Sequence, residues 1–217
     1  MKHDLIIRGG KLVTANETYT ADIGIKDGRI ATLGEDLDGN DIINADKKLV
    51  MPGGIEAHCH IAQESSNGIM TSDDYETGSI SAAFGGNSCF VPFAAQKKGE
   101  SIASTIAEYD RRAETKSVID YSYHLILTDP NENVMNELPS AFERGITSFK
   151  VFMTYATRVS DAQFLDILTI ARRHGGLTMV HAENHDMLSW MSNALTQAGY
   201  TCLLYTSDAA DDVVWVG

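Results

Sequence analysis

Short apolar runs recur along the chain after Pro52, and helical patterns fill the gaps between them. The starts of the runs lie roughly 25–35 residues apart, which is the length of a strand followed by a helix. The runs are "GIEAHCHI" (54–61), "NSCFVPFAA" (87–95), "IDYSYHLILT" (119–128), "ITSFKVFM" (146–153) and "LTMVHAE" (177–183). Five such units form either an open doubly wound sheet or part of a (β/α)8 barrel.

No glycine-rich G-x-G-x-x-G follows any of these runs, so the dinucleotide-binding sheet loses its main support. We expect an α/β fold, a partial (β/α)8 TIM barrel of about five βα units. In such a barrel, functional groups gather where the strands end, at the C-terminal rim.

The helical segments carry start and stop signals. Ser160 with Gln163 predicts a capping box for the segment that ends at Gly175-Gly176, and Ser72 predicts an earlier helix start. The core-facing stripe predicted for the helix after Ser160 is Phe164, Leu165, Leu168 and Ala171. Pro139 is expected to split the helix of "ENVMNELPSAFERG".

The first fifty residues predict a small β unit, part of an N-terminal β-sandwich. "DLIIRGGKLVT" indicates a strand, a Gly-Gly turn and a second strand. Asp27-Gly28 between apolar runs predicts a hairpin, and "DIINADKKLVMPG" adds one or two short strands. The expected organisation is therefore residues 1–50 as this β unit, 51–200 as the barrel units, and 201–217 as a separate tail.

Charge and cysteine content limit the partners and the compartment. The formal net charge is −13 and the pI about 4.8, which argues against nucleic acid or an anionic membrane as a partner. The three widely spaced cysteines predict reduced thiols rather than a disulfide framework. With no signal-peptide pattern and no apolar run of about 20 residues, we expect a soluble cytoplasmic protein.

Two histidines, His58 and His60, stand one residue apart at the end of the first apolar run. In a strand, residues i and i+2 point to the same side, so both imidazoles can reach one metal ion. The alternative is a surface pair without a role. Their place at the barrel rim favours the metal site.

Lys150 and His181 occupy comparable positions in the fourth and fifth runs. Lys150 is the one charged residue in an apolar strand pattern, so it either snorkels from an edge strand or carries an amine used chemically. His181, taken by itself, is more simply a hydrogen-bonded core histidine. The recurrence of such residues at the ends of strands one, four and five favours a shared site.

The blocks "MPGGIEAHCH", "AAFGGNS", "GITSFKVFM" and "VHAEN" resemble dihydropyrimidinases and D-hydantoinases, cyclic-amide members of the amidohydrolase superfamily. The resemblance extends from about residue 3 to about residue 200. It implies that His58, His60 and His181 bind two divalent metal ions, expected to be zinc. It also implies that Lys150 is carboxylated by CO2 to a carbamate that bridges them, and that Tyr155 contacts the substrate and the oxyanion.

The implied activity is metal-dependent hydrolysis of a small cyclic amide, in which a dihydropyrimidine or hydantoin ring opens to an N-carbamoyl amino acid. The resemblance also implies a homotetramer. The loop at 62–74 is expected to form one wall of the pocket. Met70 and Phe152 are candidate wall residues, although packing is the simpler role for Phe152.

The chain departs from the family pattern beyond about residue 200. The family has a further histidine ligand on a sixth strand and an aspartate on an eighth, and neither is found here. The tail "CLLYTSDAADDVVWVG" continues no family motif, and we interpret it as out-of-frame or adapter sequence. We therefore expect a fragment that is inactive by itself and prone to aggregate. The alternatives are a non-catalytic dihydropyrimidinase-like scaffold protein, or an allantoinase or dihydroorotase.

Overall fold

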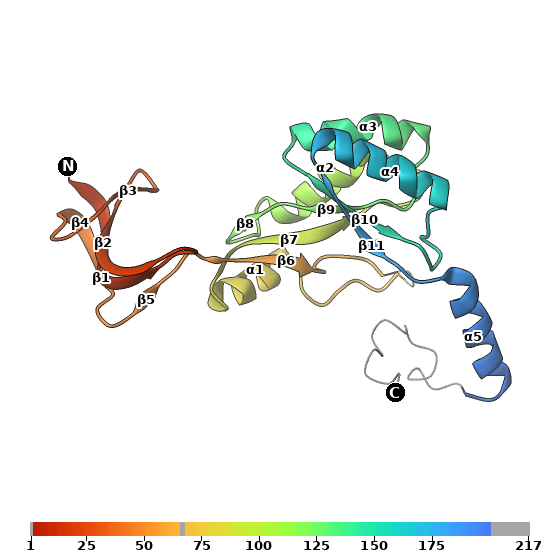
Figure 1. Cartoon of the computed structure of the whole chain (residues 1–217), viewed down its shortest axis with the longest axis horizontal. Coiled ribbons are helices and arrows are strands. Elements are labelled where there is room, and N and C mark those ends of the chain that lie inside the picture. The colour runs from red at the N-terminus through yellow and green to blue at the C-terminus, as the bar shows by residue number, and fades with distance from the viewer. Residues whose placement is uncertain (1, 66–67, 201–217) are drawn as a thin grey trace. The chain divides into compact units, whose positions relative to one another are not determined.

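The computed structural model describes residues 2–65 and 68–200 (Figure 1). The chain divides after Gly54 into two compact units, each with its own sheet. The division into 1–50, 51–200 and 201–217 stays a prediction, and residues 201–217 lie outside the described residues. Within the described part of the chain, no helix is both long enough and apolar enough to cross a membrane.

The N-terminal unit is a mixed sheet in the strand order β3-β2-β1-β4, with β5 paired to β1. Its strands are β1 (His3–Val13), β2 (Thr18–Lys26), β3 (Arg29–Gly34), β4 (Gly39–Asn44) and β5 (Leu49–Val50). Asp27 and Gly28 have φ angles of 51° and 70° and connect β2 to β3, so the predicted hairpin is confirmed.

The predicted Gly-Gly turn within the first strand is wrong. β1 runs without a break through Gly9 and Gly10, and its register against β2 shifts between Ile7 and Gly10. Gly9 has a φ of 71°, a left-handed conformation that glycine adopts without the steric cost of a Cβ. The glycines therefore accommodate a bulge in one strand instead of reversing the chain.

The second unit contains a curled, parallel half-barrel sheet in the order β11-β10-β9-β7-β6, with β8 paired to β7 (Figure 1). Its strands are β6 (Gly54–Cys59), β7 (Asn87–Ala95), β8 (Asp120–Tyr121), β9 (His124–Ile126), β10 (Ser148–Phe152) and β11 (Leu177–His181). Its helices are α1 (Tyr75–Phe84), α2 (Ile102–Ala113), α3 (Glu132–Glu143), α4 (Asp161–His174) and α5 (His185–Gln197). The predicted partial barrel of five βα units is confirmed, and the third apolar run forms two short strands rather than one.

The hydrophobic core of this unit lies between the sheet and the helices α1 to α4. Phe149 and Val151 of β10 point into it and pack with buried helix residues that include Ile106, Leu138 and Ile167. Because side chains alternate along a strand, the residues between them, such as Lys150, lie on the opposite face of the sheet. That second face carries the candidate site.

Two local predictions, one about a helix start and one about a helix face, need correction. The first helix starts from Asp74 rather than Ser72, because the Asp74 carboxylate accepts the backbone N–H groups of Glu76 and Thr77. The buried face of α4 comprises Ile167 and Ala171 with Phe164 and Ile170 at its border, whereas Leu165 and Leu168 are exposed. The Ser160–Gln163 capping box and the left-handed Gly175 at the end of α4 are confirmed.

Pro139 does not split its helix, because α3 is continuous from Glu132 to Glu143. Proline removes one backbone donor inside a helix at a cost of about 3 kcal/mol. Leu138, next to it, is fully buried, and Val134 and Ala141 are buried on the same helix. The burial of these side chains holds the segment helical across the missing hydrogen bond.

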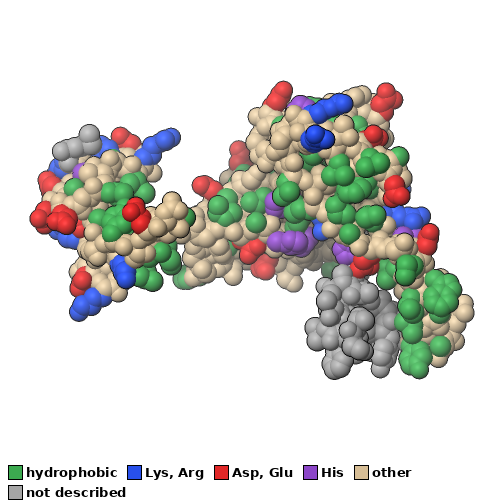
Figure 2. Space-filling model, in the orientation of Figure 1, with side chains coloured by type: hydrophobic (Ala, Val, Ile, Leu, Met, Phe, Trp, Pro, Cys, Tyr) green, Lys and Arg blue, Asp and Glu red, His purple; other side chains and the backbone are tan. Residues whose placement is uncertain are grey.

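Helix α5 differs from the other helices of the unit because none of its residues is buried. Met187, Trp190 and Met191 are each more than half exposed and follow an i, i+3, i+4 spacing, so they share one helix face. Figure 2 shows the hydrophobic side chains of this helix gathered at its surface.

Candidate metal centre

Strand β6 presents His58 and His60 on one side of the sheet. The ring centroids are 5.7 Å apart, and both rings contact Phe93 of β7, at 4.9 Å from His58 and 4.7 Å from His60. Cys59, between them, packs against the core on the helix side. The alternation of the strand therefore brings the two imidazoles together on the face away from the helices.

Cys59 lies on the other face of β6 from the two imidazoles, against the core. Burial, and to a lesser degree the charge of Glu56, raises the pKa of its thiol to about 11. The donors that this strand turns toward the candidate site are therefore the two imidazoles.

A buried histidine on β9, His124, links the strand of the histidine pair to the strand of Lys150. Its Nε2 lies 2.9 Å from the carbonyl oxygen of Ala57, and its Nδ1 lies 2.5 Å from the hydroxyl of Ser148. A carbonyl only accepts, so Nε2 carries the proton and Nδ1 accepts from Ser148. Burial lowers the pKa of His124, which favours this neutral form.

Lys150 and His181 lie on neighbouring strands. In the parallel register of β10 and β11, Lys150 pairs with Met179 and Phe152 pairs with His181. The Lys150 ammonium lies 5.4 Å from the Phe152 ring, and partial burial lowers the pKa of the amine. The Phe152 and His181 ring centroids are 5.6 Å apart.

His181 lies beside a carboxylate and beside Tyr155. Its Nε2 is 3.3 Å from Oε1 of Glu183, within the distance of an ion pair. Tyr155 follows β10 with a φ of 68°, and its ring centroid is 5.2 Å from that of His181. Such left-handed strain outside glycine is concentrated at functional sites.

The four candidate ligands share one face of the sheet. Ser148 and Lys150 are two residues apart on β10, and Ser148 contacts His124, whose ring lies 5.1 Å from Phe93. Phe93 in turn contacts His58 and His60. The structure thus groups His58 with His60 and places Lys150 on the strand beside His181, and Figure 2 shows histidine side chains close together on the visible face. Over residues 2–65 and 68–200, no three or more His, Cys, Asp or Glu side chains form a metal-binding cluster.

A cavity of about 790 Å³ lies next to Tyr155 and Phe152. Its other walls come from Gln63 and Glu64 of the loop after β6, from the segment after β7, and from helix α2. Phe152 therefore lines a cavity, as one of the two interpretations of this residue expects. Met70 is half exposed and is not among the residues that line it.

Several residues of the site carried no recognisable sequence signal. Phe93 reads as one more apolar residue of a strand, and His124 as an isolated histidine, yet both contact the groups that surround the candidate ligands. Gln63, whose Oε1 is 2.6 Å from Nδ1 of His60, lies in a loop. Only the alternation of β7 and β9 could have placed Phe93 and His124 on the inner face.

No family model matches the chain. D-hydantoinase of Geobacillus stearothermophilus is 40% identical over 205 residues, which cover 92% of this chain and 43% of that protein. Dihydropyrimidinase of Rattus norvegicus is 33% identical over 207 residues, covering 91% of this chain and 40% of that protein. A solved D-hydantoinase structure superposes with a TM-score of 0.88 at 40% identity, over 93% of this chain and 45% of that one.

The chain spans less than half the length of the curated relatives that it matches. The match nevertheless covers almost all of the chain, both in sequence and in fold, and includes the strands that carry His58, His60, Lys150 and His181. Over the length that it spans, this chain belongs to the D-hydantoinase and dihydropyrimidinase family.

Proposed function

We propose that this chain supplies metal ligands and a substrate contact to a cyclic amidohydrolase that opens a dihydropyrimidine or hydantoin ring to an N-carbamoyl amino acid. The observation that carries the proposal is the similarity to D-hydantoinases over more than nine tenths of the chain, together with the inner-face position of His58, His60, Lys150 and His181. Water is added across a ring amide bond. The acyl carbon takes the hydroxyl, and the ring nitrogen takes the proton.

The donor chemistry fits a pair of divalent ions, which we expect to be zinc. Imidazole nitrogens are preferred zinc ligands, and a carbamate on Lys150 would add an anionic oxygen donor to three neutral imidazoles. The carbamate forms when the neutral amine of Lys150 attacks CO2 and releases one proton. The lowered pKa of this amine supports that step, because only the unprotonated amine is a nucleophile. When bound, the ions would supply a water of lowered pKa and polarise the carbonyl under attack.

The remaining roles belong to residues of the chain itself. Tyr155, beside His181, would donate its hydroxyl hydrogen bond to the oxygen that becomes negative as the ring carbonyl is attacked. Glu183 would place a negative charge beside the imidazole of His181, and Phe93 would fix the planes of His58 and His60. Phe152 lines the cavity in which a cyclic amide could lie.

A chimaera tests the proposal. Residues 1–200 replace the aligned part of the Geobacillus stearothermophilus D-hydantoinase, and ring opening of hydantoin and dihydrouracil is measured with and without a chelator. We expect turnover and about two zinc ions per subunit. His58→Asn should lose turnover and bind less zinc. Lys150→Met should also abolish turnover, while Lys48→Met, at an exposed lysine of the N-terminal unit, should retain it.

The carbamate has its own signature. In buffer enriched with ¹³CO2, a carbamate carbon signal should appear in the NMR spectrum of the chimaera and be missing from Lys150→Met. A folded chimaera that binds no zinc and opens neither ring would contradict the proposal and favour a non-catalytic scaffold protein.

Two further parts of the proposal concern the whole protein. A homotetramer is implied by the family resemblance, and native mass spectrometry of the chimaera tests it. A cytoplasmic location is supported by the thiols of Cys59 and Cys89, which are not in disulfides.

A further inference from the structure

The segment between β6 and α1 leaves the strand directly after His60 and is closed at its base. The backbone N–H of Ala62 donates to the carbonyl of Asp73 at 2.8 Å, and that of Thr71 donates to the carbonyl of Gln63 at 2.9 Å. The N–H of Gln63 also donates to the hydroxyl of Thr71 at 3.0 Å. The backbone of Gln63 is therefore fixed on both of its hydrogen-bonding groups.

Gln63 is placed against the candidate ligand His60. Its side-chain Oε1 lies 2.6 Å from Nδ1 of His60. An amide oxygen can only accept, so Nδ1 must carry the proton and Nε2 keeps its lone pair. A second hydrogen bond of this kind selects the nitrogen that a histidine presents to a metal.

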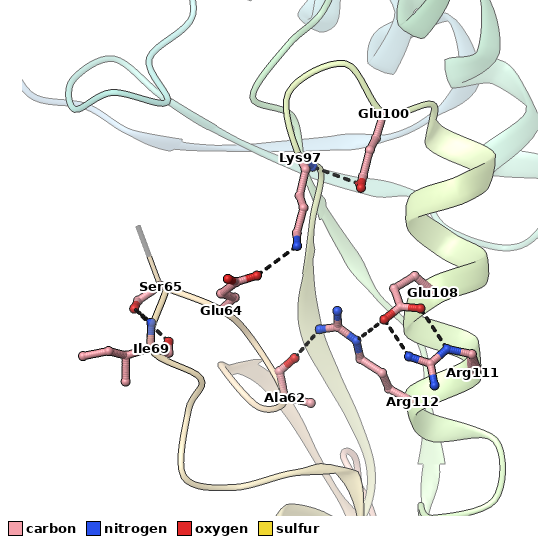
Figure 3. Close-up of polar contacts among 9 residues, drawn as sticks. All are labelled: Ala62, Glu64, Ser65, Ile69, Lys97, Glu100, Glu108, Arg111 and Arg112. Carbon is pink, nitrogen blue, oxygen red and sulfur yellow. Dashed lines mark hydrogen bonds and ion pairs between the residues drawn. The ribbon is translucent and has the colours of Figure 1, made fainter. Parts of the chain in front are cut away.

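The residue before Gln63 is held by helix α2 (Figure 3). Arg112 donates from its guanidinium to the carbonyl oxygen of Ala62 at 2.5 Å, across 50 residues of sequence. Ala62 is buried and has a φ of 47°, a conformation that costs a non-glycine residue about 1–3 kcal/mol unless its surroundings enforce it. The Arg112 bond is one contact that enforces it.

Arg112 is itself well anchored. Its side chain is 17% exposed, its Nε donates to Glu108 at 2.9 Å, and its guanidinium lies 4.7 Å from the centre of the Tyr109 ring. Arg111 binds the same carboxylate, and the two arginines lower the pKa of Glu108 to about 2. The guanidinium of Arg112 is planar and is held by these contacts, so it fixes the position of the Ala62 carbonyl.

The residue after Gln63 is tied to the same part of the fold. Glu64 pairs with the Lys97 ammonium at 2.9 Å, and Lys97 lies in the segment between β7 and α2 (Figure 3). Gln63 thus lies between two residues that are each held by a cation from one βα unit. This arrangement fixes where its amide oxygen can reach.

We infer that Gln63 and Arg112 are positioning residues, which together set the tautomer of His60 so that Nε2 faces the metal. Gln63 acts directly on the imidazole, and Arg112 acts through the Ala62 carbonyl. The role of Nε2 toward a metal rests on the proposed function, whereas the tautomer of His60 does not.

The tautomer is measured on the metal-free 217-residue chain by long-range ¹H–¹⁵N NMR at about pH 8, where unperturbed imidazoles are neutral. His60→Asn identifies the His60 signals. We expect the Nδ1–H tautomer in the wild type and in Gln63→Glu, which keeps an acceptor. Gln63→Met, similar in shape but without an acceptor, should shift the population toward Nε2–H.

Arg111 provides the matched control for Arg112. It binds the same carboxylate, whereas the guanidinium contact to Ala62 comes from Arg112. Arg112→Met should shift the tautomer in the same direction as Gln63→Met, and Arg111→Met should leave it as in the wild type. Arg112→Lys, which can retain one donor, should lie between them, and circular dichroism verifies that each variant is folded.

Zinc titration of the same variants gives the second measurement. Gln63→Met should bind zinc about 10–100-fold more weakly than the wild type, and Gln63→Glu should restore most of the loss. The tautomer comparison needs no metal, so it stays decisive whatever the zinc titration gives, whereas a folded chimaera that binds no zinc would contradict the proposed function. The inference is overturned if wild-type His60 is protonated on Nε2, if Gln63→Met leaves the tautomer unchanged, or if Arg111→Met shifts it as much as Arg112→Met.

Discussion

At the scale of single residues, Phe93 organises the candidate site although it cannot bind a metal. It is fully buried and its ring contacts three imidazoles, those of His58, His60 and His124. A flat apolar surface between donor groups limits the rotamers that each imidazole can adopt. Phe93 therefore acts on the histidine pair through shape, whereas His124 bonds to the backbone of Ala57, next to His58.

His124 predicts how the stability of the chain changes with pH. Its folded-state pKa is lowered by burial, so the unfolded chain, with a histidine pKa of about 6.5, binds more protons. The contribution of His124 to the free energy of unfolding should therefore be fully present above about pH 6.5 and should decrease as the pH falls below that value. Urea unfolding at about pH 7.5 and pH 5.5 measures this difference.

Two variants separate titration from hydrogen bonding in that experiment. His124→Gln can still donate to Ala57 but does not titrate, so its stability should change less between the two pH values than that of the wild type. Ser148→Ala keeps the imidazole and removes a neutral hydrogen bond, so it should lower stability by about 1 kcal/mol at both pH values. Equal pH dependence in His124→Gln and the wild type would contradict this assignment.

At the scale of elements, the two glycines after α4 have different physical tasks. Gly175 has a φ of 72° and open space around its missing Cβ. Gly176 has an ordinary φ, but an added Cβ would lie 2.7 Å from the Phe142 ring and 3.1 Å from the Thr147 carbonyl. The first glycine is required by its backbone conformation, and the second by its close contact with Phe142 of α3.

The matched pair Gly175→Ala and Gly176→Ala distinguishes these two requirements. Gly175→Ala should destabilise by about 1 kcal/mol, the cost of a left-handed non-glycine residue. Gly176→Ala should destabilise by about 1–3 kcal/mol, because the added methyl group overpacks a close contact. Combining Gly176→Ala with Phe142→Leu should recover part of the loss, as thermal unfolding would measure; no recovery would argue against the clash.

Pro139 gives a prediction of the opposite sign. The helix continues through it without the backbone donor that proline lacks, so Pro139→Ala should raise the free energy of unfolding by about 1–2 kcal/mol. The gain is smaller than the full propensity difference because proline also restricts the unfolded chain. Chemical denaturation measures it, and a less stable Pro139→Ala would show that the ring makes a packing contact worth more than the hydrogen bond.

The sequence predicted the elements better than their faces and ends. The strand–helix alternation and the Ser160–Gln163 cap follow from local patterns, and both appear in the structure. The stripe of α4 is rotated toward Ile167, because several apolar residues in that helix compete and only the neighbouring α3 and β11 decide which are buried. The Gly9-Gly10 bulge likewise depends on pairing with β2, which lies outside the local window.

The candidate site divides in the same way. The sequence points to His58, His60, Lys150 and His181 because each lies in or directly after a strand and matches a motif, and their roles as ligands stay a prediction. Gln63, Phe93 and His124 could not be predicted, because their roles depend on contacts across 3 to 67 residues of sequence that no pattern encodes. Their part in the site is a product of how the sheet curls.

At the scale of the whole molecule, α5 is the element with the least support. Its face of Met187, Trp190 and Met191 is exposed in an i, i+3, i+4 arrangement, and exposed apolar patches of this kind favour association. We expect concentration-dependent self-association of the 217-residue chain. Replacing Met187 and Trp190 by Gln should lower the association constant about tenfold or more.

Analytical ultracentrifugation over a range of concentrations measures that change. Leu165→Gln is the control, because Leu165 is an exposed apolar side chain on a different helix, α4. If this control lowers association as much as the double variant, general surface hydrophobicity and not the α5 face is responsible.

Cys59 offers a way to watch the barrel unit open and close. It is partly buried against the core on the helix side of β6, and its raised pKa suppresses the reactive thiolate. In a background of Cys89→Ala and Cys202→Ser, alkylation of Cys59 should be slower in the folded chain than in the chain unfolded by urea. The rate of Cys59 alkylation thus reports on the strand that carries the two imidazoles. A metal bound by these histidines should lower that rate.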